Sequence, residues 1–289
     1  MTNTNDSMKT GYAQKRKAIN TIVYIILSVM VIIWIFPIIW LVLQSFNTET
    51  GVTTKFFPSS FTFDHYISLF TDEQYPYGKW ILNTFMVAAL SCVISTLFIL
   101  MVSYALSRLR FKVRKTFLNL GLILGMFPGF MSMAATYNIM DIFGLKQQLF
   151  ALVIVYSAGA GLGYQVAKGF FDTIPRSLDE AAKIDGATRN QIFWQIILPL
   201  SKPIIVYTAL TTFTGPWADY IFVSYFMKDN ESNWTVALGL YKMLDKEAIS
   251  THFTTFCAGA VLIAIPITVL FIIMQRFYVE GVTGGAVKG

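Results

Sequence analysis

The stretch SLDEAAKIDGATRNQIFWQIILPLSKP, residues Ser177–Pro203, decides the fold. It is about as long as a membrane span, yet charged side chains occur along most of it. A long apolar run lies on either side of it. We therefore interpret it as a polar loop between two spans, folded into two short helices.

Composition indicates a membrane protein. The 289 residues are 55% hydrophobic and 13% charged, whereas soluble domains carry about 25% charged residues. In such an apolar chain, a net charge of +6 indicates cations in cytoplasmic loops rather than a nucleic-acid-binding face. Cys92 and Cys257 both lie in apolar runs, and no metal-ligand spacing occurs. We expect no disulfide framework, metal site or cofactor.

Six apolar runs are long enough to cross the hydrocarbon core. Backbone groups in lipid must be paired within a segment, so the chain is expected to be an all-α integral membrane protein with six transmembrane helices. The runs are Ile22–Leu43, Thr84–Leu106, Phe117–Tyr137, Leu149–Ala167, Ile204–Phe226 and Phe253–Met274. The expected organisation is an arm (1–21), a first span (22–43), an outer loop (44–83), a five-helix core (84–276) and a tail (277–289).

The distribution of charge predicts the orientation. With both termini inside, sixteen of the 22 Lys and Arg residues fall on the inner side. The short loop Ser107–Lys115 alone has five cations and no acid. Because cytoplasmic loops are enriched in Lys and Arg, we expect both termini and the stretch Ser177–Pro203 to be cytoplasmic.

Local signals predict the first helix of the loop. Pro175 ends the helix of the fourth span. Ser177 and Glu180 have the spacing of a capping box, with Ser177 as N-cap. The helix is expected to run to about Asp185, where Gly186 supplies the left-handed conformation that ends it.

The second helix of the loop is expected to start at another capping box, Thr188 to Gln191. Pro199 and Pro203 close it before the fifth span. An α-helical period predicts one apolar face that packs across the cytoplasmic ends of the spans. That face comprises Ile192, Phe193, Ile196, Ile197 and Leu200.

The pattern E-A-A-x-x-D-G-A-x-x-x-x-x-F-x-x-I-x-L-P, from Glu180 to Pro199, resembles the EAA loop of bacterial ABC importer permeases. The stretch beginning at Trp217 and the ending 281–289 are similar to those of the smaller permease of maltose/maltodextrin importers (MalG-type). The resemblance covers nearly the whole chain and implies the type I ABC importer (MetI-like) permease fold. Where that family usually has Asn before the acid of the fifth span, this chain has Ala218.

The resemblance implies that the EAA loop (172–203) docks in a cleft of a separate ATPase subunit. The residues it assigns to this coupling are Asp179, Glu180, Ala181, Ala182, Asp185 and Gly186. Glu180 would pair with a basic residue of the ATPase, or it serves only in the capping box. The resemblance also places the tail between the ATPase subunits, through Gly284, Gly285, Lys288 and Gly289; the alternative is a frayed tail.

Two further groups of residues each have two possible roles. In the family, the outer loop between the last two spans probes a solute-binding protein, which implicates Trp234, Leu240 and Tyr241; the alternative is that its aromatic residues are interfacial anchors. Asp219 and Trp217 face the translocation path, or Asp219 structures a kink at Gly215-Pro216.

Three classes of function were weighed. A secondary transporter is disfavoured by a single intramembrane acid and no internal repeat. A membrane enzyme is disfavoured because His65 and His252 lie outside the spans with no triad or metal spacing. No P-loop occurs, so this chain has no ATPase activity of its own and no catalytic residues are assigned.

The resemblance therefore implies a permease subunit in a bacterial inner (plasma) membrane, surrounded by lipid. Its expected partners are a second homologous permease, two ATPase subunits and an extracytoplasmic sugar-binding protein. The implied cargo is maltose or a maltodextrin, with raffinose-type oligosaccharides and glycerol phosphate as alternatives.

Overall fold

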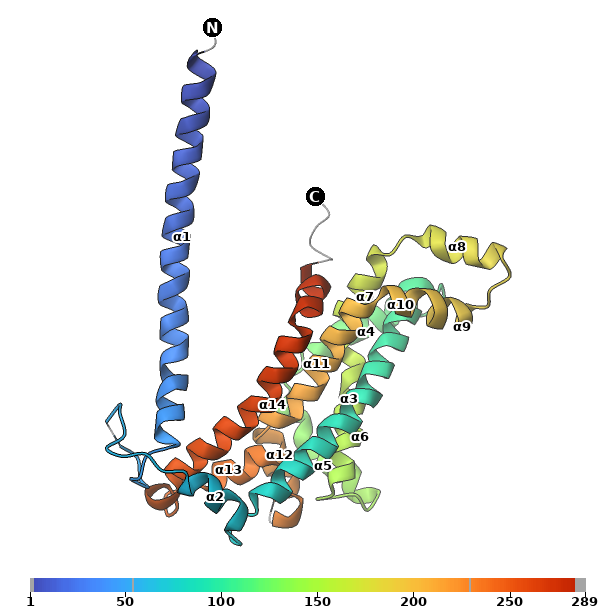
Figure 1. The fold of residues 1–289 in the computed structure, drawn as a ribbon. Coiled ribbons are helices and arrows are strands. Elements are labelled where there is room, and N and C mark those ends of the chain that lie inside the picture. The colour runs from blue at the N-terminus through green and yellow to red at the C-terminus, as the bar shows by residue number, and fades with distance from the viewer. Residues whose placement is uncertain (1–2, 54, 229, 284–289) are drawn as a thin grey trace.

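A computed structural model describes residues 3–53, 55–228 and 230–283, and all of its regular elements are helices (Figure 1). The first half of the chain forms α1 (Asn3–Gln44), α2 (Asp64–Thr71), α3 (Tyr77–Arg108), α4 (Arg114–Gly125), η1 (Gly129–Ser132), α5 (Met133–Ile142), α6 (Leu149–Ala160), η2 (Gly161–Gly163) and α7 (Tyr164–Thr173). The second half forms α8 (Arg176–Ile184), α9 (Arg189–Gln191), η3 (Ile192–Ile197), α10 (Leu198–Leu200), α11 (Lys202–Ala218), α12 (Ile221–Met227), η4 (Glu231–Asn233), α13 (Val236–Lys242) and α14 (Ile249–Thr283).

Helix α3 lies at the centre of the bundle. It packs against α6, α7 and α11, and α14 packs against the other side of α11. Helix α1 stands apart and meets the bundle only near its C-terminal end, beside α14 (Figure 1). Its apolar side chains are therefore exposed in this chain alone, as expected of a helix that faces lipid or another membrane subunit.

Four single segments are long and apolar enough to cross a membrane, and two bent pairs raise the number to six if each counts as one span. The straight segments are Arg16–Gln44, Tyr77–Arg108, Leu149–Thr173 and Ile249–Phe277. They confirm helices at the first, second, fourth and sixth expected spans. The expected arm is not a separate element, because α1 already begins at Asn3.

The third expected span, Phe117–Tyr137, is wrong as one continuous helix. The chain bends by 95° between α4 and the helical segment Gly129–Ile142. Pro128 lies at the break, has no N–H to donate and is followed by Gly129. These residues interrupt the helical hydrogen bonds that an unbroken span requires.

The fifth expected span, Ile204–Phe226, is also interrupted. Helix α11 contains Pro216 but continues to Ala218, and α12 begins at Ile221. The expected interruption is therefore present, although it lies a few residues after the proline. Helix α11 alone is about 26 Å long at 1.5 Å per residue, close to the thickness of the hydrocarbon core.

Most local expectations for the EAA loop are confirmed. Helix α7 ends at Thr173, before Pro175. Gly186 has φ +84°, the left-handed conformation that ends α8. The Thr188 side chain accepts a hydrogen bond from the Gln191 N–H, and the Gln191 side chain accepts one from the Thr188 N–H. The segment that follows this capping box lies at 83° to α11, across the end of the bundle.

Two local expectations are wrong. Helix α8 begins at Arg176 after Pro175, so Ser177 is already helical and caps nothing. In the second helix, Ile192–Ile197 forms a π-helical turn. A π turn holds more residues than an α turn, so the apolar face rotates and Leu200 becomes exposed while Ile197 is buried.

The bundle has two distinct ends. Helices α8 and α9, the start of α1 and the end of α14 lie at one end, which we call the loop end (Figure 1). Helices α2, α12 and α13 lie at the opposite end.

Candidate functional site

The two faces of α8 have different surroundings. At about 100° per residue, Asp179 and Ala182 share one side of the helix, whereas Glu180, Ala181 and Ile184 share the other. The side chains of Asp179 and Ala182 are buried against this chain's own helices. The opposite side is exposed, and Ile184 is 86% exposed.

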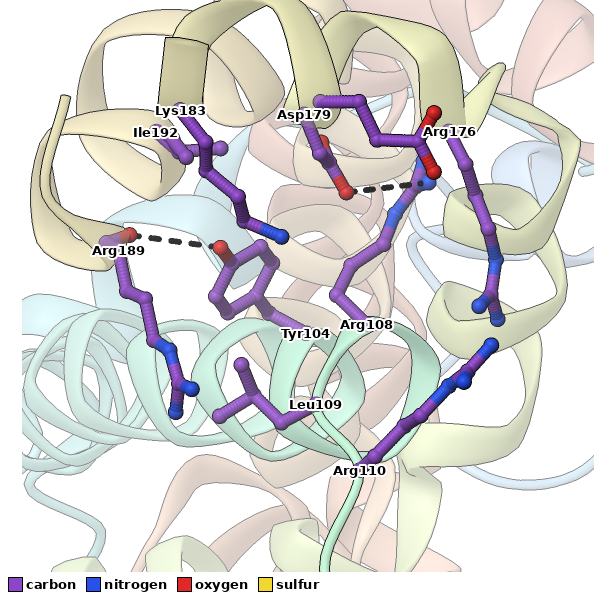
Figure 2. A pocket seen from close by; sticks show the side chains of 10 residues that line it. Tyr104, Arg108, Leu109, Arg110, Arg176, Asp179, Lys183, Arg189 and Ile192 are labelled. Atoms are coloured by element: carbon purple, nitrogen blue, oxygen red, sulfur yellow. Dashed lines mark hydrogen bonds and ion pairs between the residues drawn. The ribbon is translucent and has the colours of Figure 1, made fainter. Parts of the chain in front are cut away.

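The inward face of α8 is held by an ion pair. Nη1 of Arg108, the last residue of α3, lies 3.4 Å from Oδ2 of Asp179, and these side chains are only 3% and 11% exposed. The carboxylate of Asp179 is therefore directed into the protein rather than toward a partner, as Figure 2 shows.

The outward face of α8 carries an acidic residue, Glu180, that is free to bind a partner. Glu180 has no hydrogen bond or ion pair within the described chain, because Ser177 is not an N-cap and the expected capping box does not form. The capping alternative for Glu180 is therefore wrong. Glu180, Ala181, Asp185 and Gly186 are all exposed, so their side chains or backbone are accessible to another subunit.

The second helix of the loop is anchored. The Phe193 ring lies 4.8 Å from the ring of Tyr104, near the end of α3. The Tyr104 hydroxyl donates to the carbonyl oxygen of Arg189 at 3.3 Å. Ile192 and Ile197 are buried in the same apolar cluster, so this helix is packed firmly against the end of α3.

A pocket of about 340 Å³ lies between α8, α9 and the end of α3 (Figure 2). Arg108 is paired with Asp179, and Glu180 also lines the pocket. Four further cations line it, and none of them forms an ion pair with an acid among the described residues. These are Arg110, Arg176, Lys183 and Arg189. Their surplus positive charge favours contact with an acidic or anionic surface.

At the opposite end of the bundle, the three residues assigned to contact with a binding protein, Trp234, Leu240 and Tyr241, differ in exposure. Trp234 is 7% exposed, and its Nε1 donates to the Lys228 carbonyl oxygen at 3.0 Å. Leu240 is also buried. Only Tyr241 is substantially exposed, at 44%, and its ring stacks 3.9 Å from that of Tyr220. The structure gives Trp234 and Leu240 packing contacts and leaves Tyr241 accessible.

A second pocket, of about 420 Å³, lies beside Trp234 at this end. Its lining includes the acids Glu231, Asp245 and Glu247, and the aromatic rings of Tyr75 and His252. Tyr75 and His252 pack with their centroids 4.7 Å apart. Unlike the pocket at the loop end, this one carries a surplus of carboxylates.

Asp219 lies at the break between α11 and α12. Its Oδ1 accepts the Phe222 N–H at 3.0 Å, and its Oδ2 accepts the Tyr156 hydroxyl at 2.9 Å. These contacts cap α12 and tie the break to α6. Trp217 beside it is buried. These contacts favour a structural role for Asp219 at the break. A role of Asp219 or Trp217 in the translocation path stays a hypothesis.

The sequence analysis missed Arg108, Tyr104 and Ile184. Arg108 was visible only as one of five cations in a basic loop, and its partner Asp179 lies about seventy residues later. Ile184 had a usable signal, since it is a large apolar residue on the polar side of a strongly amphipathic helix. The tail residues Gly284, Gly285, Lys288 and Gly289 lie outside the described residues.

A bundle of interrupted membrane-spanning helices, with an exposed helix–glycine–helix loop at one end, is typical of a transport permease. Residues 99–283 match the model of the family described as "Binding-protein-dependent transport system inner membrane component". The chain belongs to this family and is a multi-pass membrane subunit of a binding-protein-dependent ABC transporter.

Similar proteins agree with this assignment. The chain is 38% identical to the galactooligosaccharides transport system permease protein GanQ of Bacillus subtilis, over 92% of this chain and 94% of that protein. It is 34% identical to the maltodextrin transport system permease protein MalD of Streptococcus pneumoniae, over 98% of this chain and 100% of that one. A crystal structure of a bacterial ABC transporter that imports alginate contains a chain of the same fold, with TM-score 0.75, 21% identity, and coverage of 91% of this chain and 98% of that chain.

Proposed function

We propose that this chain is the permease subunit of an ATP-driven oligosaccharide importer, and that α8 couples ATPase closure to transport. The observation that carries the proposal is the outward face of α8. It presents Glu180 without a partner in this chain and the exposed apolar side chain of Ile184 beside it. A carboxylate next to an apolar residue on a protruding helix suits a cleft that offers a cation and an apolar wall.

The loop end is cytoplasmic in this proposal. The support is the excess of Lys and Arg in the segments at that end. The opposite end then faces the extracytoplasmic binding protein, which Tyr241 and the acidic pocket are available to contact.

The complete machine contains a second homologous permease and two ATPase subunits. Exposure of the apolar side chains of α1 between Ile19 and Ile39 supports this arrangement, because that surface requires lipid or another subunit. Transport follows alternating access: ATP and the loaded binding protein shift the population of inward- and outward-facing states.

The cargo is a maltodextrin or a related oligosaccharide. The match to the maltodextrin permease MalD covers 98% of this chain, whereas the galactooligosaccharide permease GanQ has the higher identity, 38% against 34%. Galactooligosaccharides are therefore the second candidate cargo.

Uptake by the reconstituted complex tests the proposal. Vesicles containing the whole transporter, its binding protein and ATP are supplied with labelled maltotriose or with a labelled galactooligosaccharide. We expect ATP-dependent uptake of maltotriose, and loss of both uptake and ATPase co-purification in Glu180→Ala. Uptake of the galactooligosaccharide alone would correct the cargo. A Glu180→Ala complex that assembles and transports as wild type would contradict the coupling role.

A further inference from the structure

Arg108 joins three elements at the loop end. Besides its ion pair with Asp179 on α8, its Nη2 donates to the carbonyl oxygens of Phe171 and Ile174, each at 2.8 Å. Those carbonyls belong to the C-terminal end of α7 and the residue after it. A single guanidinium group, 97% buried, therefore connects the ends of α3 and α7 to the loop helix.

Helix α8 has few other attachments. It does not pack extensively along any other helix of the described residues, and Ala182 is its one buried apolar side chain. Within the described residues, one hydrogen bond joins α8 to α3, from Nη2 of Arg176 to the carbonyl oxygen of Ser107, at 3.4 Å. The pair between Arg108 and Asp179 is thus the main buried polar contact of α8 with the bundle.

The ion pair also joins α8 to α3, the helix at the centre of the bundle. Helix α3 packs extensively against α6, α7 and α11, and less extensively against α2 and α13. A displacement of α8 that is passed to the end of α3 therefore reaches most of the bundle.

The pair is not fully satisfied in this conformation. Nε of Arg108 and Oδ1 of Asp179 are buried without a hydrogen-bond partner among the described residues. Buried polar atoms left unpaired cost free energy, so a small shift of α8 changes the energy of this contact. A contact whose energy depends on the position of α8 is suited to transmit a movement of α8 to α3.

We propose that the ion pair between Arg108 and Asp179 is the link through which α8 moves α3, so that the two residues position the coupling helix rather than contact the ATPase. This inference rests on the proposed function, since it takes α8 as the element that the ATPase moves. It divides two adjacent acids by role: Glu180 binds the partner, and Asp179 transmits its movement.

The test compares Asp179→Asn with Glu180→Ala in the reconstituted complex. Asp179→Asn keeps the shape and removes the charge. We expect the ATPase subunits to remain bound and ATP hydrolysis to continue, while sugar transported per ATP falls by about tenfold or more, because removing one partner of a buried pair leaves the other unpaired. Asp179→Glu, which keeps the charge, should recover most of the ratio.

The matched control is Asp141→Asn. Asp141 forms an ion pair with Lys146 at 3.0 Å, but both side chains are about half exposed and lie far from α8 in the sequence. Exposed pairs contribute little, so this variant should transport with the wild-type ratio of sugar to ATP.

A double-mutant cycle separates a linked pair from two independent residues. If the two residues act as one unit, Arg108→Gln combined with Asp179→Asn lowers the ratio no further than either change alone. Independent, multiplying losses would contradict the link.

The outcomes also separate this inference from the proposed function. Asp179→Asn with a wild-type ratio overturns the link. Loss of the ATPase subunits from Asp179→Asn, as from Glu180→Ala, assigns Asp179 to docking and overturns the link while the proposed function stands. Uncoupling in Asp179→Asn with a normal Glu180→Ala complex keeps the link and removes the docking role of Glu180.

A second variant covers failure of Asp179→Asn to assemble. Arg108→Lys keeps the cation but offers one nitrogen where Arg108 uses two, Nη1 toward Asp179 and Nη2 toward the carbonyl oxygens of Phe171 and Ile174. A severalfold fall in sugar per ATP is expected, and a wild-type ratio in this variant would overturn the link.

Discussion

The two helices of the EAA loop are neighbours in sequence but differ in how they are attached. The second helix lies across the end of the bundle, with Ile192, Phe193 and Ile197 buried. Helix α8 is held mainly by one buried ion pair and keeps Glu180 and Ile184 outside. Both helices are amphipathic, so amphipathicity alone does not distinguish an anchor from a contact surface.

What distinguishes them is the kind of group on the inward face. Large apolar side chains can fill the space beside Tyr104 and hold the second helix by packing. Helix α8 has only Ala182 and Asp179 on that side, so its position depends on a directional polar contact. One loop can therefore combine a helix fixed by packing, the second helix, with a helix that is available for contact with a partner, α8.

The largest expected effect is loss of the anchor. Phe193→Ala removes a buried ring from its contact with Tyr104 and should destabilise the loop end by about 3 kcal/mol or more. The thermal unfolding midpoint of the purified complex is the measurement. Leu178→Ala, at an exposed residue of α8 outside the proposed ATPase contact, is the control, and its midpoint should stay close to the wild-type value. Equal shifts in the two variants would abolish the distinction between the helices.

A middle-sized effect is expected at the turn between the helices. Gly186 has φ +84° and nothing within 4 Å of a Cβ placed there, so Gly186→Ala should cost about 1–2 kcal/mol for its backbone conformation alone. Gly186→Asn should lose less, because Asn tolerates the left-handed region better. Comparing the unfolding midpoints of the two variants checks the prediction; no loss in either would show that the turn can relax.

The smallest effect distinguishes Thr188, which caps the second helix, from Ser177, which caps nothing. Thr188→Ala removes the hydroxyl that caps the second helix and should cost about 1 kcal/mol. Ser177→Ala changes a residue inside α8 that caps nothing, and its cost should be within about 0.5 kcal/mol. The same unfolding measurement applies. A larger loss for Ser177→Ala than for Thr188→Ala would restore the capping box that the structure excludes.

Local signals in the sequence predicted local structure well. Pro175, Gly186 and the Thr188–Gln191 box each act within a few residues, and each is found where the pattern placed it. Long apolar runs likewise predicted the spans, because lipid allows few alternatives to a helix. The break at Pro128 was also readable from the proline and its flanking glycines, but the apolar run around it outweighed that signal.

Tertiary contacts could not be read in the same way. The inward direction of Asp179 depends on Arg108, which α3 places beside α8 only in the folded chain. The exposure of Leu200 depends on a π turn that carries no local signature in these residues.

The most direct measurement of the central claim is photo-cross-linking from α8 in the assembled transporter. A benzophenone amino acid replaces Ile184 in one variant and Tyr241, at the opposite end, in another. We expect an adduct with the ATPase subunit from position 184 and none with it from position 241. Absence of an ATPase adduct at position 184 in a complex that still transports sugar, or an adduct at position 241, would contradict this claim.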